Sequence, residues 1–353
     1  AVEVYPGNTG DPTTVPDQVE KLRQGFGLSR VVLVGDRGML TQTKIDTLKQ
    51  YPGLGWISAL RSSQIRQLVQ SGSLQLSLFD QQNLAEISSP DFPEERLVAC
   101  HNPLLAAERA RKRQELLAAT EKQLQKIAQQ VARRSRTPLL EAEIALKVGK
   151  GVNRYKMAKH FTFTIADGQF QWARNQALIQ QEAELDGIYV IRTSEPPKRY
   201  SAPEVVRHYK SLSQVERAFR CLKGIDLRVR PIRHRTEDHV RAHIFLCLLA
   251  YYVEWHMRQA LAPLLFADEE LESDRKTRDP VAPAQPSESA KIKKAVRLTA
   301  EGLPLHSFDS LLKALGTRCR NTCKIKNGPA DSSFQQTTEF NPLQARAFQL
   351  LGL

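Results

Sequence analysis

The stretch from Tyr209 to Lys223 reads YKSLSQVERAFRCLK and places a phenol, a carboxylate and a cation at a constant spacing. Tyr209, Glu216 and Lys223 follow one another at intervals of seven residues. Because seven residues are nearly two turns of an α-helix, a continuous helix presents all three on one face. An apolar stripe lies about 100° round from that face and consists of Leu212, Val215, Phe219 and Leu222. We expect the stripe to dock the segment on a core, with the polar side chains along its edge.

The same letters also have a purely structural interpretation. Ser213 and Glu216 have the S-x-x-E spacing of a capping box, as do Ser201 and Glu204. Glu216 also precedes Arg220 by four residues, which is the spacing of an ion pair on a helix surface. Short motifs of this kind often occur by chance, so the helix alone favours the structural interpretation.

The spacing resembles the Tyr-Arg-Glu-Lys signature of DDE-type insertion-sequence transposases, in which two, three and six residues separate the four letters. Tyr209, Glu216 and Lys223 match, whereas Leu212 stands at the Arg position and removes one expected phosphate contact. The resemblance implies that Glu216 is the third metal-binding carboxylate of the family and that Lys223 and Tyr209 hold DNA near the cut. We add the neighbouring Arg220 to the DNA-binding candidates.

A second acidic position follows a run of four apolar residues, 31–34, which predicts a strand buried on both faces. The run ends in Gly35-Asp36-Arg37-Gly38. An acid just past the carboxyl end of such a strand lies where α/β sheets place ligand sites, and flanking glycines permit close approach. The alternative is an Asp that serves only as a loop or cap residue. The segment VGDRGM resembles the one that carries the second catalytic Asp in the same family.

The order of elements predicts an α/β fold. Strands are expected at 1–5, 31–34 and 56–60, with helices at about 14–26 and 43–51 between them. The resemblance implies a ribonuclease-H-like catalytic core, incomplete at its N-terminus, in which these are the third, fourth and fifth strands. Asp36 and Glu216 are 180 positions apart (216 minus 36), which is far more than the connection between two core elements needs.

A large inserted α+β domain is therefore expected between the second and third acidic positions. The predicted division is 1–60 and 195–266 for the core, 61–194 for the insertion, and 267–353 for a linker and a small C-terminal helical region.

The predicted insertion contains a long helix and a β-hairpin. Residues 104–136 predict the helix, and the apolar positions Leu117, Leu124 and Val131 repeat every seven residues. This repeat leaves open a coiled-coil dimer and, as the commoner outcome, packing within the chain. Asp167-Gly168 predicts a two-residue turn between strands at 160–165 and 169–174. The aromatic residues on these strands are more often a core face than a base-stacking platform.

Basic residues concentrate at the end of the long helix and beyond it. The candidates for phosphate contact are Arg133, Arg134, Arg136, Lys147, Lys150, Arg154 and Lys156, with Lys159 and His160 following. Gly149 and Gly151 lie within the run, where backbone N–H groups can approach an anion. A net charge of +13 suits a polyanionic partner, either nucleic acid such as double-stranded DNA or an acidic membrane surface. A merely solvated basic surface is the alternative.

The C-terminal third predicts a strand at 226–232, a wide-faced buried helix at 237–261, a flexible linker at 268–288, and helices at 308–315 and 342–351. His239 and His243 have a metal-binding spacing on the long helix, but no third ligand is arranged with them. Five cysteines, an odd number, indicate a reduced cytosolic chain. No signal-peptide pattern opens the sequence, and the longest apolar run, 244–253, is too short to span a bilayer.

Taken with these residues, the resemblance implies a bacterial-type insertion-sequence transposase that cleaves and joins DNA by two-metal phosphodiester chemistry. Asp36 and Glu216 match two of three carboxylates, and their hard oxygen ligands imply Mg²⁺ or Mn²⁺. The partners are transposon ends and target DNA, with a homodimer on DNA left open and a cytoplasmic, nucleoid-associated location. No residue matches the first Asp, and neither Asp11 nor Asp17 is a natural substitute. We therefore expect a truncated copy that binds DNA without cutting it. The alternatives are a non-catalytic DNA-binding remnant and a zinc-dependent hydrolase that uses His239 and His243.

Overall fold

The computed structural model describes residues 3–225, 227, 229–326, 329 and 333–353. The chain divides into two compact units. The first unit comprises Gly10–Lys210 and Pro280–Pro283. The second comprises Ala1–Thr9, Ser211–Asp279 and Ala284–Leu353.

The first unit is built on a five-stranded mixed sheet with the strand order β1-β2-β7-β4-β3. Its strands are β1 (Val31–Val34), β2 (Leu54–Ala59), β3 (Leu84–Ile87), β4 (Arg96–His101) and β7 (Ile188–Thr193). β1 and β2 are parallel, and every other neighbouring pair is antiparallel. The helices that accompany this sheet are α1 (Val15–Phe26), α2 (Gln42–Leu48), α3 (Ser62–Gln70) and α7 (Ala202–Lys210), with short 3₁₀ turns η1 (Asp11–Thr14) and η2 (Leu76–Phe79). The predicted α/β character is confirmed, and β1 has the predicted bounds.

The two faces of this sheet are covered by different helices. Successive residues of a strand point to opposite faces, so Trp56 and Ile57 of β2 enter different cores. Trp56 packs with α1 and α2, whose buried residues include Val19 and Ile45. Ile57 packs under α7, where Val205 is fully buried. Asp36 follows β1 directly, so this packing fixes the start of the loop that carries it.

The range 61–194, predicted to be an insertion, contributes strands to the same sheet as β1 and β2. β7 pairs with β2 on one side and with β4 on the other. Strands from 61–194 and the strands β1 and β2 therefore form one continuous sheet. The domain boundaries at 61 and 194 stay a prediction.

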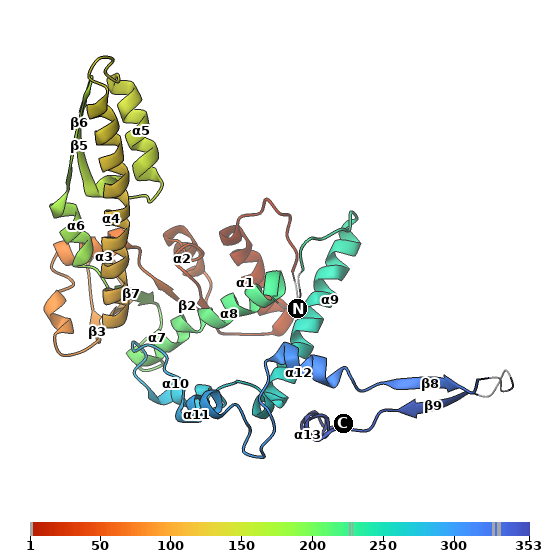
Figure 1. Ribbon diagram of the computed structural model, residues 1–353. Helices are drawn as coiled ribbons and strands as arrows, with labels where there is room; N and C mark the ends of the chain where they lie inside the picture. Colours follow the sequence, from red (N-terminus) through yellow and green to blue (C-terminus); the bar gives the residue numbers. More distant parts are fainter. Residues whose placement is uncertain (1–2, 226, 228, 327–328, 330–332) are drawn as a thin grey trace. The chain divides into compact units, whose positions relative to one another are not determined.

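The rest of that range forms a helical arm with its own core (Figure 1). We call the arm residues 103–183; its elements are α4 (Pro103–Arg133), α5 (Glu141–Asn153), η3 (Ala158–His160), β5 (Phe161–Ala166), β6 (Gln169–Arg174) and α6 (Gln176–Ala183). Leu117 and Leu124 of α4 are fully buried against α5 and the β5–β6 hairpin. Phe161 and Phe170 of the hairpin join the same core. The seven-residue repeat therefore packs within the chain, and the aromatic residues form a core face, as predicted.

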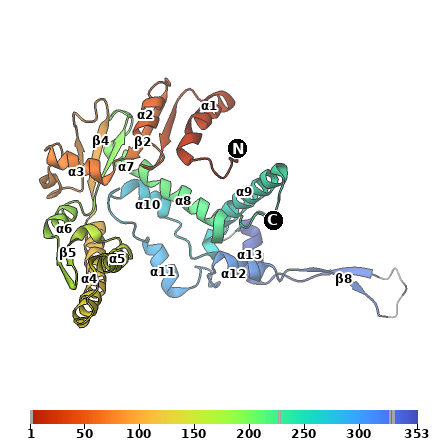
Figure 2. The ribbon, with the colours of Figure 1, turned by 90° about the horizontal axis from the view of Figure 1, so that it is seen from above.

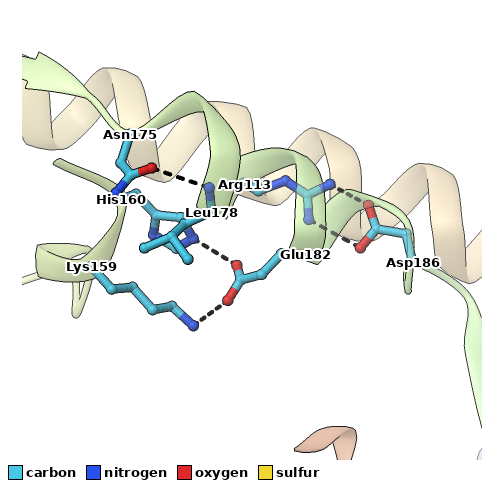
Figure 3. Close-up of polar contacts among 7 residues, drawn as sticks. All are labelled: Arg113, Lys159, His160, Asn175, Leu178, Glu182 and Asp186. Atoms are coloured by element: carbon cyan, nitrogen blue, oxygen red, sulfur yellow. Dashed lines mark hydrogen bonds and ion pairs between the residues drawn. The ribbon is translucent and has the colours of Figure 1, made fainter. Parts of the chain in front are cut away.

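A polar cluster joins η3 and α6 near the middle of α4 (Figure 3). The Glu182 carboxylate accepts from Lys159 and contacts the buried His160 ring, with 2.6 Å between Oε2 and Nε2. Arg113 of α4 pairs with Asp186 just after α6. Burial acts to raise the pKa of Glu182, but the hydrogen bonds from Lys159 and His160 outweigh it and hold that pKa below its usual range.

Glu182→Gln should destabilise the arm by about 1.5 kcal/mol at pH 7, because hydrogen bonds to charged groups are lost. Since the folded pKa of Glu182 is depressed, its contribution is present above the unfolded-state pKa of about 4.3. That contribution is lost as the pH falls through the folded value. Thermal unfolding at pH 7 and at stepwise lower pH should show a difference from wild type that shrinks towards zero. Glu184→Gln, at an exposed position on the same segment, is the matched control, and an equal effect there would contradict the assignment.

The second unit is mainly helical. Its elements are α8 (Leu212–Arg220), the π-helical turn η4 (Cys221–Ile225), α9 (Glu237–Ala260), η5 (Ala262–Leu264), α10 (Leu271–Thr277), α11 (Glu288–Val296), α12 (Phe308–Leu315), β8 (Arg320–Lys324), β9 (Ser333–Thr337) and α13 (Pro342–Leu350). Its core gathers the C-terminal end of α9, η5, α12 and α13 around Leu261, Leu264 and Leu311. The predicted burial of α9 is wrong. No residue of the helix is buried, because its apolar residues surround it and only its end joins this core.

Three other expectations differ from the structure. Residues 268–288 are not a structureless linker, since α10 forms there and Val281 is fully buried in the core under α7. No strand forms at the described residues of 1–5 or 226–232, while 1–2, 226 and 228 lie outside the described residues. The β8–β9 hairpin was missed, because alternating polar residues without apolar partners give no strand signal.

Candidate active site and nucleic-acid interface

Asp36 lies two residues past β1, at the carboxyl end of that strand, and is exposed. Its Oδ1 accepts hydrogen bonds from the backbone N–H groups of Gly38 and Met39, at 2.9 and 2.7 Å. A Cβ at position 38 would come within 3.3 Å of that oxygen, so a glycine there suits the close approach. Within the described part of the chain, Oδ2 has no partner. Asp36 thus closes its own loop, as the structural alternative requires, and still presents one carboxylate oxygen outward.

Polar side chains in the sheet form hydrogen bonds with both ends of the loop that carries Asp36. The Ser58 Oγ donates to the Asp36 carbonyl at 3.3 Å. Ser58 pairs with Arg192 across β2 and β7, and directly paired residues point to the same face. Arg192 donates to Gln42, the first residue of α2, at 2.9 Å and forms a buried ion pair with Glu95. The loop from Asp36 to α2 is therefore held at both ends.

Sequence reasoning missed Arg192 and Glu95. The guanidinium of Arg192 lies 5.2 Å from the Trp56 ring and 5.0 Å from the Phe92 ring. Both side chains of the ion pair are almost completely buried, at 4% and 3% exposure. The one available signal was a charged residue inside the otherwise apolar strand IYVIRT, since a buried charge needs a partner.

Glu195 is a second buried carboxylate, but it lies at the other end of β1. A Cβ on Gly55 would collide with its Oε1, and Gly55 pairs with Val32. Val32 is four residues before Asp36, about 13 Å along an extended chain. Burial raises the pKa of Glu195, while Arg30 and Arg199 each approach its carboxylate at 3.2 Å. This position makes Glu195 a structural ion-pair partner rather than a companion of Asp36.

The segment 209–223 is divided among three elements. Tyr209 lies in α7, Glu216 in α8 and Lys223 in the π-helical turn η4, with Ser211 between the two helices. Ser211 retains helical angles, φ −64° and ψ −16°. The predicted docking of the apolar stripe is not observed, because no residue of α8 is buried and Val215 and Phe219 are exposed.

The two proposed capping boxes have different outcomes. Glu204 accepts from the backbone N–H and hydroxyl of Ser201, at 2.8 and 2.7 Å, and these bonds lower its pKa. At Glu216 the helix has already begun at Leu212, so no helix end is available to cap. In the described residues, the exposed Glu216 carboxylate has no hydrogen bond and no ion pair with Arg220. The two structural roles considered for Glu216 are thereby removed.

The DNA-binding candidates near Glu216 lie in different environments. Lys223 is exposed, and its ammonium lies 5.4 Å from the Phe219 ring centre. Arg220 is exposed at the end of α8. Tyr209 is partly buried and packs on the core under α7. Asp36 and Tyr209 belong to the first unit, whereas Glu216, Arg220 and Lys223 belong to the second. The approach of Asp36 to Glu216 therefore stays a prediction.

The basic residues from Arg133 to His160 form two groups with different partners. One group is exposed and without an ion pair in the described structure: Arg133, Arg134, Arg136, Lys147, Lys150, Arg154 and Lys156. The first three are at the end of α4, and the others lie on α5 and just after it. Lys159 and His160, by contrast, are bound to Glu182. The open cationic surface therefore ends before Lys159.

The role considered for Gly149 and Gly151 is wrong. Both lie inside α5, where backbone N–H groups are used by the helix itself. A Cβ on Gly151 would lie 3.4 Å from Ile127 Cδ1 of α4. The small residue thus suits close packing of α5 on α4.

The described residues include no group of three or more His, Cys, Asp or Glu side chains that could hold a metal. The His243 Nε2 lies 3.1 Å from the Val229 carbonyl, and His239 packs against the His234 ring. This arrangement lends no support to the zinc-hydrolase alternative.

All five cysteines are free thiols. Among the described helices, none is both long and apolar enough to cross a bilayer.

A protein-family comparison adds to this geometry. The family model described as transposase DDE domain matches residues 1–253. The matched range contains Asp36, Tyr209, Glu216 and Lys223 and ends within α9. No curated protein and no solved structure matches the chain.

Proposed function

Because this chain belongs to the transposase DDE domain family, we propose that it acts on the ends of an insertion sequence and on target DNA. The reaction is cleavage and transfer of DNA strands. The observation that carries the proposal is the family match, which spans both acidic positions. The chain would work in the cytoplasm, on nucleoid DNA.

Asp36 and Glu216 are the proposed metal-binding residues. Both fit a hard dication such as Mg²⁺ or Mn²⁺, because each presents carboxylate oxygen to solvent without a competing cation in the described residues. When bound, such ions activate an attacking oxygen and stabilise the leaving oxygen of a phosphodiester. Asp36 is held by its two backbone hydrogen bonds, so its free oxygen has a fixed direction. Lys223 and Arg220, within two turns of Glu216, would hold a phosphate near the cut, and Tyr209 would position the strand.

A ribonuclease-H-like core is the proposed scaffold. The parallel pairing of β1 with β2, with Asp36 beyond the carboxyl end of β1, supports this assignment. The residues of this sequence match two of the three family carboxylates. No acid of the described residues is assigned as the third.

A second candidate function is DNA binding without cleavage. The observation that favours it is the exposed arm surface of seven unpaired cations, which needs no metal to bind phosphates. Both candidates require DNA binding, so the arm provides the first test.

Replacing Lys147, Lys150, Arg154 and Lys156 with Ala should weaken binding to all duplex sequences alike, by at least about tenfold. Each lost phosphate contact should also reduce the slope of log K against log salt by about 0.9, or up to about 3.6 for four contacts. Fluorescence anisotropy with a duplex of mixed sequence, titrated at several salt concentrations, measures both quantities.

A matched control uses cations that are already neutralised. Arg111→Ala/Lys112→Ala removes two arm cations that pair with Glu108, and it should change the slope far less than Lys147→Ala/Lys150→Ala. Equal slopes for wild type and the fourfold variant would mean that the arm surface is merely solvated.

A further inference from the structure

The β8–β9 hairpin forms a two-stranded ribbon that extends away from α12 and α13 in both views (Figures 1 and 2). It lies outside the matched range 1–253. Nine of its ten strand residues are exposed, and Cys323 is intermediate. An isolated two-stranded hairpin is marginally stable in water. Because its strand residues are almost all exposed, the ribbon is not explained by packing in a core. The side chains on its surface are therefore the feature to examine.

The stem of the ribbon is anchored on the unit. Cys319 and Thr338 exchange hydrogen bonds of 3.0 Å at its base. The Arg318 guanidinium lies 4.0 Å from the Phe340 ring centre, and Phe340 packs against Phe348 of α13. The direction in which β8 and β9 leave the unit is therefore fixed by contacts at their base.

The register divides the ribbon into two unlike faces. Paired residues share a face and successive residues alternate. One face carries Arg320, Thr322 and Lys324, paired with Thr337, Gln335 and Ser333. The other carries Asn321 with Gln336 and Cys323 with Phe334. The first face consists entirely of polar side chains and includes two cations.

Among the described residues, no acid pairs with the cations of this face. Neither strand, RNTCK or SFQQT, contains an acidic residue. Arg320 and Lys324 are exposed and without an ion pair in the described structure. A two-stranded ribbon fits the major groove of B-DNA, which is about 12 Å wide, and Arg, Lys, Gln and Thr side chains can bond to phosphates and base edges there.

We propose that the β8–β9 ribbon enters the major groove of duplex DNA with the Arg320–Lys324 face against the bases and phosphates. This inference rests on the proposed function, because it assigns a further contact to a protein that binds DNA. It gives the second unit a duplex-binding element that is separate from the arm of the first unit.

The test uses the whole chain and a 30-base-pair duplex of mixed sequence as the probe. Arg320→Ala/Lys324→Ala should bind about tenfold more weakly and lower the salt slope by about 1.8, at about 0.9 per phosphate contact. Arg320→Lys should retain most of the affinity, because the charge remains. The control, Lys276→Ala/Lys294→Ala, removes two exposed cations of the same unit and should bind within about twofold of wild type.

A second duplex tests the groove. Its cytosines carry a glucosylated 5-hydroxymethyl group, which obstructs the major groove and leaves the phosphates unchanged. Wild-type affinity should fall on this duplex to that of the ribbon variant, and the affinity of the ribbon variant should not fall further.

Unchanged binding by the ribbon variant, together with weakened binding by the arm variant, overturns the ribbon assignment alone. Equal losses for wild type and ribbon variant on the obstructed duplex overturn the groove assignment. No binding of the whole chain to either duplex overturns both proposals.

Discussion

Glu216→Gln should reduce Mg²⁺-dependent DNA cleavage roughly a thousandfold while leaving the fold intact. The amide keeps the size of the side chain but removes the charge that, in the proposed function, would hold a dication. Metal ions contribute several kcal/mol to stabilising the charge that develops on the transferred phosphate, and each 1.36 kcal/mol is about tenfold in rate. Because the Glu216 side chain is exposed and unpaired in the described residues, its replacement should cost little stability. Asp36→Asn should have a similar effect on cleavage.

The measurement is a nicking assay on DNA that carries the element's own ends. We expect the 353-residue chain to bind this DNA without cutting it, because a two-carboxylate site holds a dication weakly. The Glu216 comparison is therefore made in a protein whose site contains a third carboxylate, whether that acid belongs to these 353 residues or to another segment. Glu272→Gln, at an exposed acid of the same unit, is the control and should leave cleavage unchanged. Robust Glu216-dependent cleavage by the 353-residue chain would contradict the two-carboxylate expectation and make Asp11 the first acid to test.

Arg192→Met should destabilise the first unit by about 3 kcal/mol. The change leaves Glu95, at 3% exposure, buried without its guanidinium partner. Breaking one side of a buried pair costs about 3–5 kcal/mol. We expect the low end, because Lys49 still approaches Glu95 at 4.0 Å. Contacts of the guanidinium with the Trp56 and Phe92 rings are lost as well. Urea unfolding followed by circular dichroism measures the shift of the midpoint.

Two further variants separate charge burial from general damage. Arg192→Met/Glu95→Leu should recover most of the lost stability, since replacing both members of a buried pair by apolar residues is often neutral or stabilising. Arg111→Met removes a cation from surface pairs with Glu108 and Glu115 and should cost less than about 1 kcal/mol. A double variant as unstable as Arg192→Met would show that packing, rather than the unpaired carboxylate, causes the loss.

Local patterns in the sequence determined the elements that depend on nearby residues. The apolar run 31–34 formed β1 with those bounds, and Asp167-Gly168 formed the turn of the β5–β6 hairpin. The seven-residue repeat identified the face of α4 that is buried. The order of strand, loop and acid also placed Asp36 correctly, because the carboxyl end of a strand is a position along the chain. The family membership followed from short motifs of the same local kind.

Only the tertiary structure decided which distant residues meet. The sheet order β1-β2-β7-β4-β3 depends on the pairing of β7 with β2, more than a hundred residues earlier in the chain. Periodicity within a strand carries no information about such a pairing. Such packing also brings Arg192 to Glu95 in a buried ion pair. It likewise brings Lys159 and His160 into contact with the Glu182 carboxylate. The sequence grouped Lys159 with Lys156, but only the fold brought a carboxylate to Lys159, whereas Lys156 has no ion pair in the described residues. A charge is visible in a sequence, whereas its partner is set by how the chain folds.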